Sequence, residues 1–398
     1  MPNTLLTDDV IAKEALMILE NNLVFAKNVS RKYEQTFEGE RKVGDTINVK
    51  KPSQYLVRSG AAASIQDNVQ QTIPVVVDSQ KGIDVEFTSK ELSLDLQDFS
   101  KEVLAPQMAM LANEIDFDGL ALYKKVPNLV QASLADFDTY LKAGAALDEE
   151  GCPMDDQRCL LLSPRAQVSV VNGLKGLFQS SVQIKDQYEK GRMGTAAGFD
   201  FMMSQNIPTH QVGAYIGTPL VNATLTSGAV SVVTDGWTGT VANLLREGDV
   251  VTFAGCFAVN PMNKNSTGQL RQFVITAAVG STAGAATLTI FPAMISTGAT
   301  QNVSALPADN APIVVLGTAS ASFGANLAFH KDAFTLVTVD LPLPKGMDMA
   351  ARASSKKAGL SIRLVRGYDI NSDKFISRLD VLYGWKAIRP ELACRIQG

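Results

Sequence analysis

The spacing of apolar residues predicts one long helix at residues 98–126. Its apolar positions recur at steps of three and four residues, on one face of a helix of about seven to eight turns. They are Leu104, Met108, Leu111, Ile115 and Leu122. Asp98 or Ser100 can cap the start, Pro106 fits a first turn, and Pro127 stops the helix. Taken alone, the pattern is that of an ordinary core helix.

Three further helices are predicted on the same grounds. Residues 7–35 follow a cap at Thr7 or Asp8. Their apolar stripe is Val10, Ala15, Leu16, Leu19, Leu23 and Ala26. This N-terminal arm either folds back on its own domain or lies on a neighbouring subunit. The other two helices are expected at residues 133–146 and 166–178.

Alternating apolar residues predict strands at residues 45–49, 55–58, 72–77 and 82–87. Between the second and third lies the small and polar stretch SGAAASIQDNVQQ, the predicted tip of a long hairpin. A hairpin so poor in large apolar groups does not bury itself, so its length indicates a second chain beneath it. We expect residues 61–71 to be mobile in the free subunit and ordered against a neighbour.

Composition changes at about Gly213 and changes back at about Gly317, because Thr, Gly, Ala, Val and Ser dominate between them. Short β runs such as AVSVV, VVTFAG and ATLTIF alternate with turns, which is typical of a small antiparallel barrel or sandwich. The clearest turn is LREGD, where Gly248 is free to take a positive φ and Asp249 can bond its own backbone. The flanking segments resemble each other, so the block is interpreted as an insertion in a host domain.

The host itself is predicted to be α+β. CLLLSP from Cys159 indicates a buried strand stopped by Pro164, and GFDFMMSQNIP indicates another. AFTLVTVDLPLP, LSIRLVRGYD and SRLDVLYGWKAIRPELACRIQ are the strands after the block. In the last of them, Leu379, Val381, Tyr383 and Trp385 alternate before residues 388–391 close the strand, which predicts a C-terminal segment anchored in a sheet.

Length and composition narrow the class of protein. A chain of 398 residues suggests two or three domains, and 46% hydrophobic with 19% charged residues is typical of a soluble globular protein. A net charge of -4 without blocks of like charge argues against a tight grip on DNA or an anionic membrane, but not against enclosing nucleic acid. The acidic N-terminus and the lack of an apolar run of about 20 residues favour a cytosolic origin.

Candidate catalytic and metal-binding groups are few. The two histidines, His210 and His330, have no base or nucleophile near them in sequence, so both are interpreted as structural. Asp116 and Asp118 face different directions on a helix and make a poor metal or acid/base pair. Asp95 and Asp98 do not form such a pair either. The acidic loop is interpreted as a solvated turn, with a weak divalent-cation site as the alternative. It contains Asp148, Glu149, Glu150, Asp155 and Asp156.

Two further patterns are weighed and set aside. GRMGTAAG at residues 191–198 lacks the Gly-Lys-Ser/Thr ending of a phosphate loop and precedes a strand. Cys152, Cys159, Cys256 and Cys394 have neither zinc-site spacing nor the density of a disulfide scaffold, so we expect four reduced, mostly buried thiols. The sequence therefore predicts no catalytic, cofactor-binding or metal-binding residue, and a protein that is not an enzyme.

The order of parts resembles the major capsid proteins of tailed bacteriophages. Three patterns carry the likeness: GFDFMMSQNIPTH before the insertion, LLREGDVVTFAGCFAVNP inside it, and LYGWKAIRPELA near the C-terminus. The resemblance implies the Hong Kong 97 type of coat fold with an inserted immunoglobulin-like barrel, as in coat proteins of the Salmonella phage P22 type.

The resemblance also implies six parts of the chain. These are an N-terminal helical arm at 1–38, an extended β-hairpin loop at 39–89, a peripheral domain with its spine helix at 90–132, an axial domain with part of the peripheral domain at 133–212, an inserted all-β domain at 213–317, and return strands of the peripheral and axial domains at 318–398. In the family the inserted domain aids subunit folding and reaches between capsomers by a charged loop. Here VVTDGWTGTVANLL offers only Asp235, so those salt bridges are not carried over, and Lys50 and Lys51 do not specify a covalent lysine–asparagine crosslink.

The function that the resemblance implies is self-assembly into the icosahedral shell that encloses the double-stranded DNA of a tailed phage. The implied partners are other copies in hexamers and pentamers, a scaffolding protein, a portal and, as an optional addition, a decoration protein. DNA is enclosed without sequence-specific binding, and no membrane is involved. The procapsid would form in the host bacterial cytoplasm. The alternatives are an encapsulin-like compartment shell and, less favoured, a cytosolic enzyme with a β insertion.

Overall fold

The computed structural model describes residues 8–31, 46–57, 60–61, 65, 71–88, 104–174, 194–355 and 359–398. They belong to two compact units. The first draws on Met1–Lys50, Thr72–Gly119 and Phe334–Lys386, and the second on Lys51–Gln71, Leu120–Ala333 and Ala387–Gly398. Each unit is therefore built from segments far apart in the sequence, and its core depends on long-range packing. Within the described residues, no helix has the length and apolar character needed to cross a bilayer.

The first unit is built on an antiparallel sheet. Its strands are β18 (Met349–Ser355), β19 (Leu360–Asp369), β20 (Lys374–Ala387) and β3 (Ser79–Thr88), in that order, and β17 (Phe334–Val339) also pairs with β20. Leu379 lies between Leu364 and Ile83 in neighbouring strands. Leu379, Val381 and Tyr383 are all buried, as their alternation predicts. One face of this sheet is therefore apolar along its length.

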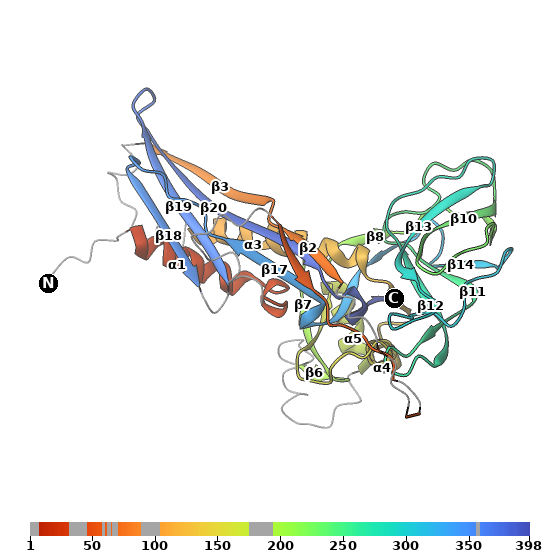
Figure 1. Ribbon diagram of the computed structural model, residues 1–398. Helices are drawn as coiled ribbons and strands as arrows, with labels where there is room; N and C mark the ends of the chain where they lie inside the picture. Colours follow the sequence, from red (N-terminus) through yellow and green to blue (C-terminus); the bar gives the residue numbers. More distant parts are fainter. Residues whose placement is uncertain are drawn as a thin grey trace. The chain divides into compact units, whose positions relative to one another are not determined.

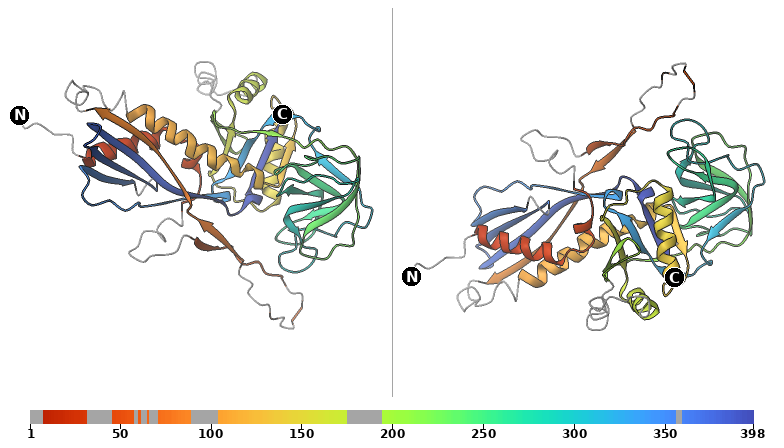
Figure 2. Two further views of the ribbon diagram at one scale, coloured as in Figure 1. Left: turned by 90° about the horizontal axis from the view of Figure 1, so that it is seen from above. Right: turned by 90° about the horizontal axis from the view of Figure 1, so that it is seen from below.

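Two helices run along that apolar face (Figures 1 and 2). α1 (Asp8–Asn22) packs against β18 and β19, and its predicted residues Ala15, Leu16 and Leu19 are buried. α3 (Ala105–Leu120) is the core of the predicted long helix, with a proline in its first turn as expected. It continues from Leu120 as the 3-10 helix η4 (Ala121–Lys125), while residues 98–103 lie outside the described part.

The N-terminal helix is shorter than predicted. It ends at Asn22, and the chain turns into the 3-10 helix η1 (Ala26–Asn28). The reason is a carboxylate: Asp116 of α3 accepts hydrogen bonds from the backbone N–H groups of Val24, Phe25 and Ala26, at 2.7, 3.1 and 3.0 Å. These donors would otherwise extend the helix. The expected helical residues 32–35 lie outside the described part.

β1 (Thr46–Lys50) and β2 (Thr72–Val76) form an antiparallel hairpin, with Thr46 opposite Val76, so the partner of β2 is the first predicted strand and not the one expected at residues 55–58. The strand predicted at residues 55–58 is wrong for its described residues, because residues 51–57 contain no strand. Tyr55, Leu56 and Val57 are 57%, 42% and 95% exposed. Most of the predicted tip lies outside the described residues.

The second unit contains a six-stranded mixed sheet, called the host sheet below. In order, its strands are β4 (Asn128–Gln131), β21 (Ala393–Gln397), β16 (Asn326–His330), β5 (Arg158–Leu162), β7 (Phe199–Met203) and β6 (Thr195–Ala196). β5 is fully buried and ends before Pro164, as predicted. β21 anchors the C-terminal segment between β4 and β16, which confirms the expected anchoring in a sheet.

Helices of this unit begin at positions that local capping explains. α4 (Phe137–Glu149) starts four residues later than predicted, because Ser133 forms a turn in which its Oγ accepts from Ala135 N and its carbonyl accepts from Thr139 Oγ1. α5 (Pro164–Leu174) starts two residues earlier, since proline suits the first helical position. α4 covers β4 and β21.

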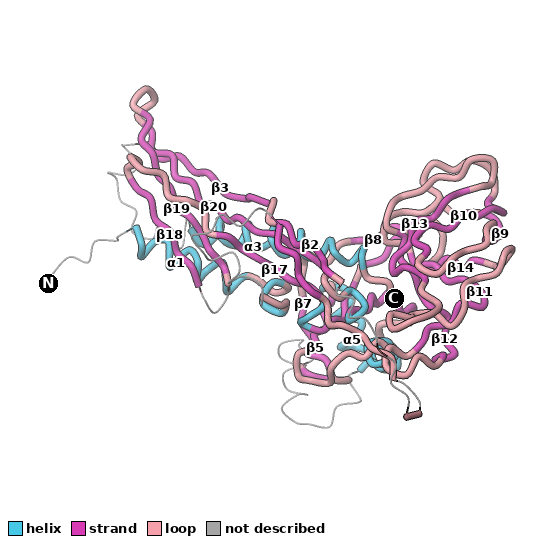
Figure 3. The backbone as a smooth tube through the Cα atoms, in the orientation of Figure 1, coloured by secondary structure: helices cyan, strands magenta, loops and turns pink. Residues whose placement is uncertain are grey.

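The unit also holds the predicted antiparallel barrel (Figure 3). Its sheet order is β14 (Ile313–Leu316), β11 (Val250–Val259), β12 (Ser266–Ile275), β13 (Ala286–Met294), β10 (Ala229–Trp237) and β9 (Gly217–Val221). The outer strands meet, because Val221 N donates to Ala311 O at 3.0 Å and Leu220 bridges to Pro312. Trp237, Phe253, Phe273 and other apolar side chains fill the interior. Closing the sheet removes its free edges.

The chain enters and leaves the barrel through two adjacent strands. β8 (Thr209–Gln211) pairs antiparallel with β15 (Ser322–Gly324), with His210 opposite Phe323. We call this pair the neck. It explains how a block of local strand pairs is inserted without interrupting the host sheet.

Candidate functional site at the base of the barrel

A buried polar network joins the neck, the barrel and the host part of the second unit. Tyr123 Oη lies 3.1 Å from His210 Nδ1, and His210 Nε2 lies 2.9 Å from Asp249 Oδ1. The His210 ring therefore bridges the tyrosine hydroxyl and the carboxylate, with one ring nitrogen on each. All three residues are buried. Tyr123 comes from η4, His210 from β8 and Asp249 from the turn before β11.

The second oxygen of Asp249 fixes the start of the insertion. Asp249 Oδ2 accepts from Arg246 N at 2.7 Å, so the predicted bond to its own turn is present, and from Gly213 N at 3.0 Å. Gly248 has the expected positive φ of 99°. A Cβ on Gly213 would lie 2.2 Å from Leu244 O, so only glycine fits there. One carboxylate therefore ties Gly213, where the inserted block begins, to the turn before β11.

Arg395 of β21 brings a cation into the same network. It is 1% exposed, and its Nη1 donates to Gly248 O at 2.6 Å. The guanidinium lies over the Tyr123 ring, 6.0 Å from its centroid. Burial lowers the pKa of Arg395 to about 10, against the raising effect of Tyr123 and Asp249, so the side chain stays charged at neutral pH.

A second link joins the barrel to the edge of the host sheet. The side-chain amide of Gln272 in β12 meets the backbone of Leu129 in β4. Leu129 N donates to Gln272 Oε1 at 2.6 Å, and Gln272 Nε2 donates to Leu129 O at 3.0 Å. An apolar cluster surrounds this contact, formed by Leu129, Val250 and Val274 with Phe291 and Leu316.

Ion pairs lie at the margin of the contact. Glu247 pairs with Lys125 at 2.8 Å and with Lys124 at 3.6 Å. Burial would raise the pKa of Glu247, but the hydrogen bond and charge of Lys125, with Lys124, outweigh it and hold the pKa below its ordinary value. These side chains are 34–43% exposed, so the pairs contribute little, at most about 1 kcal/mol. Arg271 and Glu150 form a more buried pair.

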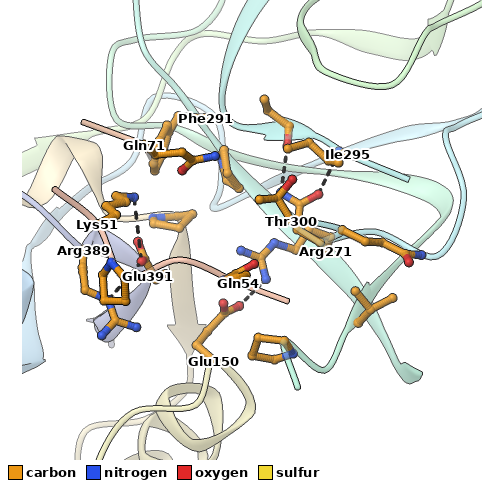
Figure 4. Close-up of a pocket in the computed structure, with 18 residues that line it drawn as sticks. Lys51, Gln54, Gln71, Glu150, Arg271, Phe291, Ile295, Thr300, Arg389 and Glu391 are labelled. Atoms are coloured by element: carbon orange, nitrogen blue, oxygen red, sulfur yellow. Dashed lines mark hydrogen bonds and ion pairs between the residues drawn. The ribbon is translucent and has the colours of Figure 1, made fainter. Parts of the chain in front are cut away.

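A cleft of about 350 Å³ opens beside that buried pair (Figure 4). Arg271 and Glu150 lie on one side, and Lys51 and Arg389 flank Glu391 on another. Lys51 Nζ lies 3.9 Å and Arg389 Nε 3.4 Å from Glu391 Oε1. Because its charges are paired within the walls, the cleft presents no concentration of one sign to an ion.

The prediction that the histidines lack partners is wrong. His210 has Asp249, and His330 Nε2 lies 2.9 Å from Asp155 Oδ1 while its Nδ1 accepts from Asp332 N at 3.2 Å. The partners come from distant sequence positions, which proximity along the chain does not show. In both rings the two nitrogens are engaged in bonds within the fold, and both rings are buried.

The acidic loop is only partly the solvated turn that was predicted. Glu149 and Asp156 are exposed. Asp148 pairs with Arg158 at 2.6 Å, Glu150 with Arg271, and Asp155 with His330. The basic partners lie on β5, β12 and β16, so the loop connects strands. Among the residues with described positions, no group of three or more potential ligands could hold a metal ion.

Asp116 and Asp118 point in different directions, as predicted. Burial raises the pKa of Asp116, against three backbone N–H groups that lower it. Asp118 accepts from Tyr383 Oη at 2.6 Å and pairs with Lys81 at 2.8 Å. Asp95, Asp98 and residues 191–193 of the set-aside phosphate-loop pattern lie outside the described residues. All four cysteines are free and buried, as expected.

Comparison with known proteins gives one match over almost the whole chain. The family model described as "P22 coat protein - gene protein 5" matches residues 3–398. No curated protein matches.

Solved structures with similarity include a chain of Mycobacterium phage Che8, with 12% identity, a TM-score of 0.49, and coverage of 94% of this chain and 90% of that one. A capsid structure of Cyanophage P-SCSP1u has 11% identity, a TM-score of 0.45, and coverage of 94% and 88%. The CUS-3 coat protein I-domain has 20% identity and a TM-score of 0.20, with 26% of this chain and 96% of that one covered.

Proposed function

Because the chain belongs to the P22 coat protein family, and is thus the major capsid protein of a phage, we propose that its copies self-assemble into a closed icosahedral shell around double-stranded DNA. The family match over residues 3–398 is the observation that carries this proposal. Hexamers and pentamers are the proposed capsomers, with scaffolding protein and portal as partners. Assembly takes place in the host cytoplasm.

Exposed apolar side chains on the extended segment support contacts between subunits. Val57 and Ile65 are 95% and 96% exposed, and Tyr55 is 57% exposed. Large apolar groups at such exposure favour a partner surface. Closed shells form from many such contacts, each weak by itself and repeated by symmetry. The six-part division of the chain given above stays a proposal on the same basis.

The role is structural, and we propose no enzymatic activity. In support, both histidines are held by bonds within the fold, and the protein is of the coat type. A net charge of -4 suits a shell that encloses DNA without gripping it tightly. An encapsulin-like compartment is less favoured by the family match, and packaged enzyme in purified shells would be its signature.

The test is electron microscopy of the overexpressed chain, with and without its scaffolding partner, alongside size-exclusion chromatography. Closed shells of defined diameter are the expected product. A stable monomer at high concentration under both conditions would contradict the proposal. A saturable small-molecule ligand would instead revive the enzyme alternative.

A further inference from the structure

β4 is the edge strand of the host sheet. Among the described strands, it pairs with β21 alone. An outer strand exposes backbone N–H and C=O groups, which invite pairing with another chain. In β4 the outward groups of Leu129 are those that Gln272 occupies, and Leu129 is 5% exposed.

The Gln272 side chain substitutes for a neighbouring strand. Its amide presents one acceptor and one donor, as a peptide group does, and both bond to the same residue, at 2.6 and 3.0 Å. The backbone of Gln272 meanwhile pairs in the barrel, opposite Thr252 of β11. This residue therefore belongs to the barrel ladder by its main chain and to the host sheet by its side chain.

Directional contacts hold the barrel on the host part of the unit. They include the Asp249 network at the neck, the Gln272 amide and the buried Arg271–Glu150 pair. The apolar cluster between them is non-directional, because apolar burial depends on area and not on angle. The ion pairs of Glu247 are half-exposed and weakly directional. The paired hydrogen bonds at Leu129 are directional, and they fix rotation about the neck.

We propose that Gln272 is a positioning residue, which sets the orientation of the barrel on the host sheet and thereby the angle at which the barrel meets neighbouring subunits. This second step rests on the proposed shell function. The first step concerns the subunit alone, so it is measured in the free subunit and does not depend on assembly.

The substitution Gln272→Leu removes both hydrogen bonds and keeps the side chain of similar size. Gln269→Leu is the matched control, since Gln269 lies on the same strand, is exposed and makes no side-chain bond to the host sheet. Gln272→Glu keeps the acceptor for Leu129 N and loses the donor, so it should give an intermediate result. It also serves as the test variant if Gln272→Leu does not fold.

Two readouts apply to the free subunit. Hydrogen exchange at the Leu129 amide should accelerate about tenfold or more in Gln272→Leu and stay unchanged in the control. Spin labels at Ser231→Cys in the barrel and Ser169→Cys in α5 report orientation, since both native residues are exposed on regular elements. Their distance distribution should broaden or shift in Gln272→Leu only. An unchanged distribution would overturn the positioning role even if Leu129 exchange accelerates.

In assembly, the measured quantity is the distribution of shell diameters. It is compared between Gln272→Leu and Gln269→Leu under conditions in which both variants have the same thermal stability. Gln272→Leu should give fewer regular shells and a wider range of diameters than Gln269→Leu. Identical shells together with a changed label distance would overturn the link from orientation to assembly. Failure of the unsubstituted chain to form any shell would contradict the proposed function and leave the label measurement to decide the positioning role.

Discussion

Replacing Asp249 with alanine should destabilise the second unit more than any exposed acidic substitution. The side chain is fully buried and accepts three hydrogen bonds, from the ring of His210 and the backbone N–H groups of Arg246 and Gly213. Alanine leaves all three donors without an acceptor. It also removes the attraction between Asp249 and the buried Arg395 guanidinium.

The magnitude follows from these losses. A buried donor without a partner costs about 1–3 kcal/mol. The three donors lose the same acceptor group and their costs overlap, so we expect a total of about 3–5 kcal/mol and not their sum. Against a typical stability of about 5–15 kcal/mol, this is a large fraction. Asp249→Asn keeps one acceptor oxygen and should cost about 1–3 kcal/mol.

Urea denaturation of the free subunit, followed by tryptophan fluorescence, measures the change in the free energy of unfolding. Trp237 lies in the barrel core and reports on that part. Asp309→Asn is the control, because Asp309 is exposed and should change stability by less than about 0.5 kcal/mol. A loss below about 1 kcal/mol for Asp249→Ala would refute the argument that this carboxylate holds the base of the barrel.

Three further predictions concern the barrel core, pH and the thiols. Phe253→Ala should lower the free energy of unfolding by about 3–5 kcal/mol, because Phe253 is fully buried against Phe273. A fragment of residues 213–317 should melt cooperatively. Unchanged soluble yield and assembly of the variant would show that the barrel core is assigned wrongly. The pKa of Glu247 is lower in the folded than in the unfolded state, so ionised Glu247 stabilises the fold above its unfolded pKa, and this stabilisation is lost as pH falls through its folded pKa. Glu247→Gln should therefore flatten the dependence of stability on pH below about pH 4.5. A stability profile parallel to that of the unsubstituted chain would contradict this prediction. Burial raises the pKa of all four thiols, to about 11 for Cys159 and to about 12 for Cys256 and Cys394. A thiol reagent at pH 8 should therefore label none of the four cysteines in the native subunit and all of them in urea.

Sequence patterns predicted strands and turns well where residues close in sequence decide which side chains are buried. Alternation at Leu379, Val381 and Tyr383 gave the core of β20, and the apolar run from Cys159 gave β5. The turn at Gly248 and Asp249 was also predicted with its conformation. Each of these features depends on side-chain period or on turn chemistry within a few residues.

The contacts that hold the parts together were not predictable in the same way. Asp116 ends a helix some 90 residues earlier in the chain, since it accepts from Val24 at a sequence separation of 92. Gln272 bonds Leu129 across 143 residues, and Arg395 bonds Gly248 across 147. Nothing in the flanking sequence distinguishes these side chains from solvated ones. A polar residue beside an apolar neighbour within a strand, as Gln272 is beside Phe273, is the one local hint.

The position of β21 has a consequence for the timing of folding during translation. It lies between β4 and β16 and roughly 80 residues downstream of β14, so about 4–16 s separate their synthesis at about 5–20 residues per second. In that interval the barrel has all its strands, while the host sheet has a gap where β21 belongs. A ribosome-bound chain therefore carries a complete barrel on an incomplete sheet. Until β21 emerges and Arg395 reaches Gly248, the nascent subunit lacks both a complete host sheet and the buried bond from that sheet to the barrel turn.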